Sequence, residues 1–374
     1  MAYLRSSNAG DVTRPWPPSS ALSHRNIIIN GGMTIAQRGT SISSVGIDTY
    51  TLDRWKQFAF TGAENGRSTV TQESITDLAG FSKALKMTVT TTSSSLGGTH
   101  GYGLQTRLEL NTMQHFEIGT AYSKPLVASF YAKAGTGGSS GAVGTYTFHL
   151  AVSGGGYYLK EFTITTSWQR FEIPIPVTVD SNMKTTTTAL NLGALYMGFG
   201  LSIGSSGTDG VHGVWTDGGK WATSNQSDFY DNSGNELYIT GCQLELGTVA
   251  TPFEHRSFED ELQKCMRYYE KSFDYATAVG TATDAGSMMF MANRNPGSPH
   301  QALRLKTEKR AVPTYVVHNS AVTDETGTFR NVDASNNPAA TVSRHGASGA
   351  TVYSGTSATL GQFIQYHYTA TAEL

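Results

Sequence analysis

The chain carries little charge, little cysteine and no long apolar run. Only 15% of its 374 residues are charged, and 27 Lys and Arg against 29 Asp and Glu give a net charge of −2. No basic stripe is present, which argues against a nucleic-acid partner. No run approaches the roughly 18 apolar residues of a membrane helix, and residues 1–20 lack the apolar core of a signal peptide. We therefore expect synthesis in the cytosol and no membrane insertion.

Two cysteines, Cys242 and Cys265, are too few for a disulfide framework. We expect two buried free thiols, with a disulfide between a strand and a helix as the alternative. No His/Cys spacing supplies a metal site. No phosphate-loop, dinucleotide or nucleophile-elbow motif is present either. The sequence therefore predicts no metal, no cofactor and no catalytic residue.

Glycine is abundant, with 41 residues, and aromatic residues make up 10% of the chain. This composition favours many short strands joined by tight turns. Residues 26–255 show such strands at regular intervals and predict one all-β sandwich or jelly-roll domain. Pro174 and Pro176 place the strand over 169–177 at a sheet edge, because proline cannot donate a ladder hydrogen bond.

Residues 1–25 form a polar arm in which Trp16 lies between Pro15 and Pro17. Such a segment is extended and has no core of its own. It is either a disordered tail or a docking peptide that orders on a partner, with Trp16 as the anchor.

Residues 256–273 predict a helix, with Ser257 and Asp260 as a capping box. Its apolar face packs either on the protein's own sandwich or in a three-chain bundle along a fibre axis. Residues 274–374 predict a second β domain, with its clearest strands at 311–317 and 363–369. The predicted oligomerisation residues on the helix face are Phe258, Leu262, Cys265, Met266 and Tyr269.

Three segments carry a family resemblance. QLELGTVATPFEHRSFEDELQKCMRYY, at 243–269, resembles a segment recurrent in bacteriophage tail-fibre and virion structural proteins. NIIINGGMTIAQRGTS…YTLDRW, at 26–55, resembles the beginning of a carbohydrate-binding-module-like jelly roll in the same proteins, and IQYHYTATAEL, at 364–374, resembles their terminus. The resemblance implies a homotrimeric fibre in the virion, docked by the arm onto tail or baseplate proteins.

Attachment to host-surface polysaccharide or lipopolysaccharide without chemistry is the function that this resemblance implies. A head-fibre or decoration protein without receptor contact is one alternative. A glycan-degrading tailspike is another, with a loop carboxylate such as Asp217 or Asp228 in catalysis. Carbohydrate-binding jelly rolls often hold a calcium ion through an aspartate on the last strand, and Ile239 to Cys242 contain none, which argues against that site.

The long loop between Leu201 and Leu237 is the predicted receptor site. It combines aromatic and small polar residues with flexible glycines, as binding loops do. Aromatic rings stack on sugars while polar groups bind the hydroxyls. The alternative is that Trp215 and Trp221 cover a subunit interface or cap the sandwich. The predicted glycan or receptor contacts are His212, Trp215, Asp217, Trp221, Phe229, Tyr230 and, more weakly, Tyr157.

Overall fold

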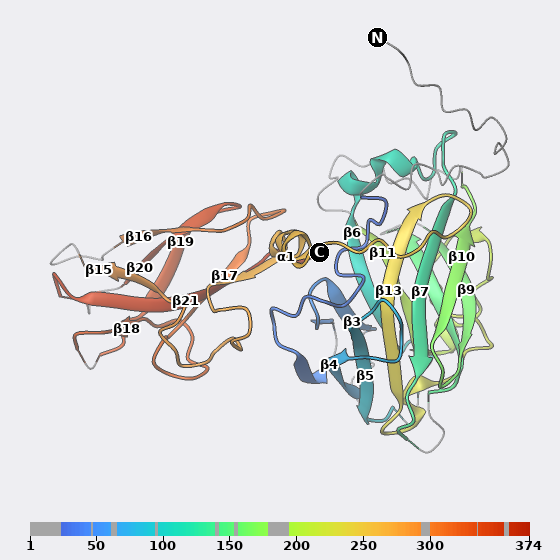
Figure 1. Ribbon diagram of the computed structural model, residues 1–374, viewed down its shortest axis with the longest axis horizontal. Helices are drawn as coiled ribbons and strands as arrows, with labels where there is room; N and C mark the ends of the chain where they lie inside the picture. The colour runs from blue at the N-terminus through green and yellow to red at the C-terminus, as the bar shows by residue number, and fades with distance from the viewer. Residues whose placement is uncertain are drawn as a thin grey trace, which may run out of the picture.

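The structure is a computed structural model that describes residues 24–45, 48–60, 66–93, 96–138, 142–152, 156–178, 194–292, 300–334, 336–354 and 359–374. These residues form two β units with one α-helix between them (Figure 1). Within the same ranges, no helix is long and apolar enough to cross a membrane. The predicted anchor Trp16 lies outside the described residues, as does the predicted arm up to residue 23.

Two antiparallel sheets make the first unit. Sheet A contains, in spatial order, β1 (Ser41–Val45), β4 (Arg67–Ser74), β5 (Lys83–Thr91), β13 (Glu236–Leu246), β7 (Leu126–Ala134) and β10 (Gln169–Ile175). Sheet B contains β12 (Trp215–Thr216), β9 (Tyr157–Ile164), β8 (Gly144–Val152), β11 (Ala194–Ile203), β6 (Gly101–Glu109), β3 (Trp55–Ala59) and β2 (Thr49–Tyr50). Short 3-10 helices lie at Leu110–Phe116 (η1), Ser205–Gly207 (η3) and Phe229–Asp231 (η4).

The core of this unit lies between the two sheets, where alternate strand residues point inward. Phe130 of β7 meets Phe199 of β11 at 4.8 Å between ring centroids, so aromatic side chains from both sheets interlock. The predicted all-β jelly-roll sandwich is confirmed. β10 lies at the edge of sheet A, as Pro174 and Pro176 predicted.

The single α-helix, α1 (Phe258–Met266), is shorter than the predicted span of 256–273. Ser257 caps it by accepting a hydrogen bond from the Asp260 backbone N–H, as predicted. The helix ends early because β14 (Tyr269–Lys271) pairs with the last strand of the chain. Helical periodicity beyond residue 266 is therefore misleading, since tertiary strand pairing overrides it.

The second unit is built around β21 (Phe363–Thr371). This strand pairs with β14, β15 (Met288–Met291), β17 (Thr314–His318) and β18 (Arg330–Asn331). A separate sheet contains β16 (His300–Arg304), β20 (Gly349–Ser354) and β19 (Ala340–Gly346). Side chains of both sheets form a second hydrophobic core, which includes Leu303, Val352 and Tyr366. The described β21 includes the predicted strand at 363–369.

A buried polar network joins the two units, and we call it the joint. Arg54, only 1% exposed, forms an ion pair with Glu373, and its guanidinium carbon lies 3.5 Å from the centroid of the Tyr268 ring. Arg38 binds the same carboxylate at 2.9 Å and lies 3.9 Å from the centroid of the Tyr269 ring. Side chains more than 300 positions apart in the chain thus share one ionic cluster.

A second ion pair lies on the helix side of the joint. Arg267 donates two hydrogen bonds of 2.9 Å to Glu109, and the Tyr268 hydroxyl donates a third. Burial raises the pKa of Glu109, but these hydrogen bonds outweigh it and leave the pKa below its ordinary value. Glu261 accepts from the backbone N–H of Asn30, which ties α1 to the first unit.

Candidate functional site

The predicted receptor loop folds back over the outer face of sheet B. The backbone N–H of Gly213 donates to Leu159 of β9 at 2.7 Å, and β12 pairs with the same strand. Gly200 permits this packing, because a Cβ there would lie 2.5 Å from the Trp221 carbonyl oxygen. The loop is therefore a cover on the sheet, and most of its aromatic residues face inward.

Phe229 and Tyr230 are fully buried, which corrects their assignment as ligand contacts. η4 turns both rings into the sandwich, and Tyr230 stacks on Tyr102 at 4.3 Å. The Tyr230 hydroxyl accepts a hydrogen bond from Gln57. Burial raises the pKa of Tyr230 above its ordinary value. Rings without an exposed face cannot stack on a sugar.

The other predicted contacts do not converge on one site. Tyr157 is 3% exposed and packs on the outer face of sheet B, so it too is corrected. Trp215 is half-buried, and its indole N–H donates to the Pro176 carbonyl at 2.7 Å. It packs 5.8 Å from Tyr158, which matches the predicted capping role. His212 and Asp217 are exposed on the loop.

Trp221, one of the predicted glycan contacts, lines a pocket of about 210 Å³. Phe60 and His100 line it as well. The two aromatic rings meet at 5.3 Å, and Thr99 and Ser206 add polar groups. We call it the Trp221 pocket. Phe60 and His100 were missed, since only the loop sequence drew attention to this region.

Two of the residues that line the Trp221 pocket carry hydrogen-bond donors. His100 Nδ1 accepts from the Gly97 backbone N–H at 3.0 Å, so the neutral ring presents Nε2–H as a donor. Among the described residues, the Trp221 indole N–H makes no hydrogen bond. An aromatic wall with two donors is the chemistry that binds sugar hydroxyls.

His149 lies beneath Trp221 on the outer face of sheet B. Its ring meets Trp221 at 4.9 Å and Phe58 at 5.6 Å. Both ring nitrogens are buried without a partner in the described part of the chain. Burial lowers the pKa of His149 to about 3, so the ring is neutral at ordinary pH.

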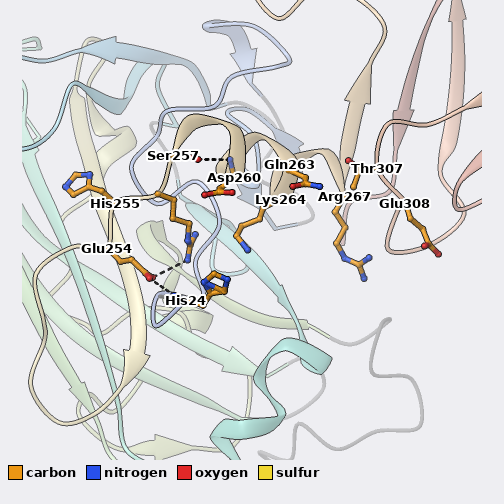
Figure 2. Close-up of a pocket in the computed structure, with 11 residues that line it drawn as sticks. His24, Glu254, His255, Ser257, Asp260, Gln263, Lys264, Arg267, Thr307 and Glu308 are labelled. Carbon is orange, nitrogen blue, oxygen red and sulfur yellow. Dashed lines mark hydrogen bonds and ion pairs between the residues drawn. The ribbon is translucent and has the colours of Figure 1, made fainter. Parts of the chain in front are cut away.

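A larger groove of about 580 Å³ runs along the joint. Figure 2 shows Lys264 and Arg267 projecting from α1 to the side on which His24 and Glu254 lie. Arg267 is already paired with Glu109, while Lys264 has no recorded partner within the described ranges. The lining of this groove is rich in charged and polar side chains, and His24 and His255 supply its aromatic rings.

The predicted oligomerisation residues divide into two groups. Cys265 and Tyr269 are buried within the single chain, which corrects their assignment to an interchain seam. Burial raises the pKa of both free thiols, Cys242 and Cys265, and no disulfide joins them. Leu262 and Met266 are half-buried, and Phe258 is 45% exposed beside Tyr275.

Of the carboxylates proposed for a tailspike, Asp228 has a structural role and Asp217 is exposed. Asp228 accepts from the Tyr230 backbone N–H and from Ser202, so it caps η4. Asp217 lies at the exposed loop tip beyond β12. Across the described ranges, no cluster of three or more His, Cys, Asp or Glu residues could hold a metal ion.

Solved structures similar to this chain include several carbohydrate-binding modules. A family 11 module from Clostridium thermocellum, solved with a β-1,3-1,4-mixed-linked tetrasaccharide, is 15% identical and covers 57% of this chain and 98% of its own, with a TM-score of 0.29. A CBM4 structure is 12% identical over 58% and 98% of the two chains, with a TM-score of 0.30. TmCBM61 with β-1,4-galactotriose is 11% identical over 60% and 99%, with a TM-score of 0.29.

Neither protein-family models nor curated proteins gave a match. TM-scores near 0.3 are too low to support a shared fold or ligand. The jelly-roll assignment therefore rests on the two sheets and their common core.

Proposed function

We propose that this chain is a non-catalytic glycan-binding protein that serves as a fibre subunit of a bacteriophage virion. Its ligand is polysaccharide or lipopolysaccharide on the host surface. The observation that carries glycan binding is the Trp221 pocket, where Phe60 and Trp221 supply ring surface and His100 supplies a donor. Its volume of about 210 Å³ lies below the roughly 300 Å³ at which pockets for larger ligands begin, so it suits a single sugar ring.

Two substitutions test this pocket with little effect on the fold. Trp221→Phe keeps an aromatic ring against Phe58 but removes the indole N–H. His100→Ala removes the Nε2 donor. Each lost hydrogen bond should weaken glycan binding by roughly 3- to 10-fold. Affinity electrophoresis in mixed-linkage β-glucan, β-1,4-galactan, xylan and purified lipopolysaccharide measures this, with Tyr122→Ala as the exposed control. If both variants migrate like the wild type in every polysaccharide that retards the wild type, the Trp221 pocket is not the glycan-binding site.

The fibre assignment is supported by the sequence resemblance and by where its three segments lie. Arg38 and Arg54 come from the first segment, Tyr268 from the second and Glu373 from the third. All four meet in the joint. The three segments thus meet at the connection between the two β units, which suits a subunit of an elongated particle.

The proposed assembly is a homotrimer that docks through residues 1–25 onto tail or baseplate proteins. Light scattering after size exclusion should give three times the chain mass, and Leu262→Asp with Met266→Asp should lower it if α1 contributes. A monomeric wild type would sink the fibre assignment while leaving glycan binding intact. A decoration protein would instead assemble normally but bind no glycan. Sugar release that is lost in Asp217→Asn would favour the tailspike.

A further inference from the structure

The outer face of sheet A, on the opposite side of the sandwich from the Trp221 pocket, carries a row of aromatic side chains. Tyr238 on β13 and Tyr131 on β7 each lie between two core residues, so they point outward. Phe81 and Phe253 continue the row at 5.2 Å centroid steps. We call this set the sheet A row; its members, half-buried except for exposed His255, are Trp168, Tyr238, Tyr131, Phe81, Phe253 and His255.

The backbone of β13 is shaped to hold this row. Gly241 has φ +63° at an irregularity in the pairing of β13 with β7. A Cβ at this position would lie 2.8 Å from Phe81 and 2.9 Å from Tyr131. Glycine therefore lets the two rings lie directly over the strand. Half-exposed rings held in this way are uncommon on a solvated sheet face.

Ion pairs fix the polar groups beside the rings. Lys133 lies 5.0 Å from the centroids of both Trp168 and Tyr238 and is bound to Asp77. Asp77 also accepts from the Trp168 indole N–H at 2.9 Å, which sets the position of that ring. Hydrogen bonds from Lys133 and Trp168 lower the pKa of Asp77.

Charge on this face is balanced pair by pair. In addition to Lys133 with Asp77, Lys86 pairs with Glu236 at 2.7 Å. Arg170 likewise pairs with Glu172. The face thus presents rings, donors and acceptors with little net charge. Such a surface matches a neutral, hydroxyl-rich polymer better than nucleic acid or an acidic polysaccharide.

The row also leads into the joint groove. His255 meets Phe253 at 4.9 Å and lines that groove, whose volume is about 580 Å³. The surface thus runs from the edge of sheet A across β7 and β13, which lie side by side in Figure 1, to the base of α1. Its extent favours a chain of sugars over a single ring.

We propose that the sheet A row and the joint groove form a second binding surface, which takes an extended neutral polysaccharide. The proposal rests on the proposed function, because the ligand is again a glycan. Beyond the proposed function, it specifies the class of polysaccharide and a second site outside the loop between Leu201 and Leu237. Two surfaces on one subunit raise avidity for a polymer, because the second contact becomes intramolecular.

The test compares the double variant Trp168→Ala/Tyr238→Ala with Tyr122→Ala, which removes a 79% exposed ring outside the row. The probes are mixed-linkage β-glucan, β-1,4-galactan and xylan, with the β-glucan tetrasaccharide as the short ligand and polygalacturonate as the acidic polymer. The double variant should bind the neutral polymer that the wild type binds roughly tenfold more weakly. Tetrasaccharide binding at the Trp221 pocket and the behaviour of Tyr122→Ala should stay unchanged.

Four results would overturn the inference. If the double variant and the wild type bind the polymer equally well, the sheet A row does not bind glycan, while glycan binding at the Trp221 pocket is unaffected by that result. A changed solution mass in the double variant would show that the row is a protein interface. Salt-sensitive binding of polygalacturonate in preference to neutral polymers would refute the charge argument. A wild type that binds no glycan at all would refute the proposed function together with the row.

Discussion

Glu373 is the residue whose loss we expect to weaken the joint most. Its carboxylate binds Arg54 and Arg38, and Arg54 is only 1% exposed. Glu373→Gln leaves that guanidinium buried without a counter-charge. Removing one partner of a buried ion pair costs roughly 3–5 kcal/mol. Because Arg54 keeps the Tyr268 ring and the Arg107 carbonyl, we expect the lower end, about 3 kcal/mol.

Urea unfolding followed by tryptophan fluorescence measures this loss. About 3 kcal/mol corresponds to a fall in the midpoint of roughly 1 M urea at an m-value near 3 kcal/mol/M. The control is Glu117→Gln, whose partner Lys124 is 46% exposed at 3.6 Å. This change should cost about 0–1 kcal/mol.

A second comparison distinguishes the cost of leaving the Arg54 charge buried without a partner from the cost of losing its contact with Glu373. Arg54→Met with Glu373→Leu removes both charges and should unfold at a higher urea concentration than Glu373→Gln alone. Equal midpoints for Glu373→Gln and Glu117→Gln would refute the reasoning. A double variant that loses more stability than the single one would refute it as well.

Three further predictions concern buried groups. The pKa of His149 is about 3 in the folded protein and 6.5 in the unfolded chain, so between these pH values only the unfolded state binds the proton. The free energy of unfolding should therefore fall by about 2–3 kcal/mol between pH 7.5 and 4.5. His149→Leu should make the free energy of unfolding less dependent on pH across that range. Gly31→Ala places a Cβ 2.0 Å from the Cys242 carbonyl oxygen, whereas in the control Gly32→Ala the atom nearest to the new Cβ is 3.6 Å away. Thermal unfolding should show a loss of stability of roughly 1–3 kcal/mol for Gly31→Ala and none for Gly32→Ala. Cys242 and Cys265 should react with a thiol reagent only after denaturation, and rapid labelling of the native protein would contradict their burial.

The sequence predicts a strand best where apolar residues alternate clearly. Alternation or apolar runs predict strands at 84–90, 125–132, 146–152 and 237–246, and β5, β7, β8 and β13 lie within a few residues of these ranges. β4 was missed because Val70 is its single large apolar residue and its other residues are polar. β6 was missed because its glycines face bulky neighbours, such as Phe58 beside Gly103, which no local pattern reveals.

The candidate site, too, could be predicted only in part from the sequence. Loop composition identified Trp221, but the inward turn at Phe229 and Tyr230 depends on the core that they complete. The apolar face of α1 predicted that the helix must pack, without indicating which surface it packs on. The partners of Arg54 lie between 53 and 319 positions away in the chain, so its burial carries no local signal.

The central place of β21 also constrains how the chain folds as it leaves the ribosome. β14, β15, β17 and β18 all pair with this one strand, and the first of them precedes it by about 90 positions. None of these pairs can form until residues 363–371 have been synthesised. The first unit can collapse earlier, since its strands end at Leu246. β14, β15, β17 and β18 therefore stay unpaired for seconds during translation, at about 5–20 residues per second. In that interval these strands, above all the apolar residues 288–291, depend on chaperones or on rapid synthesis to avoid pairing with another chain.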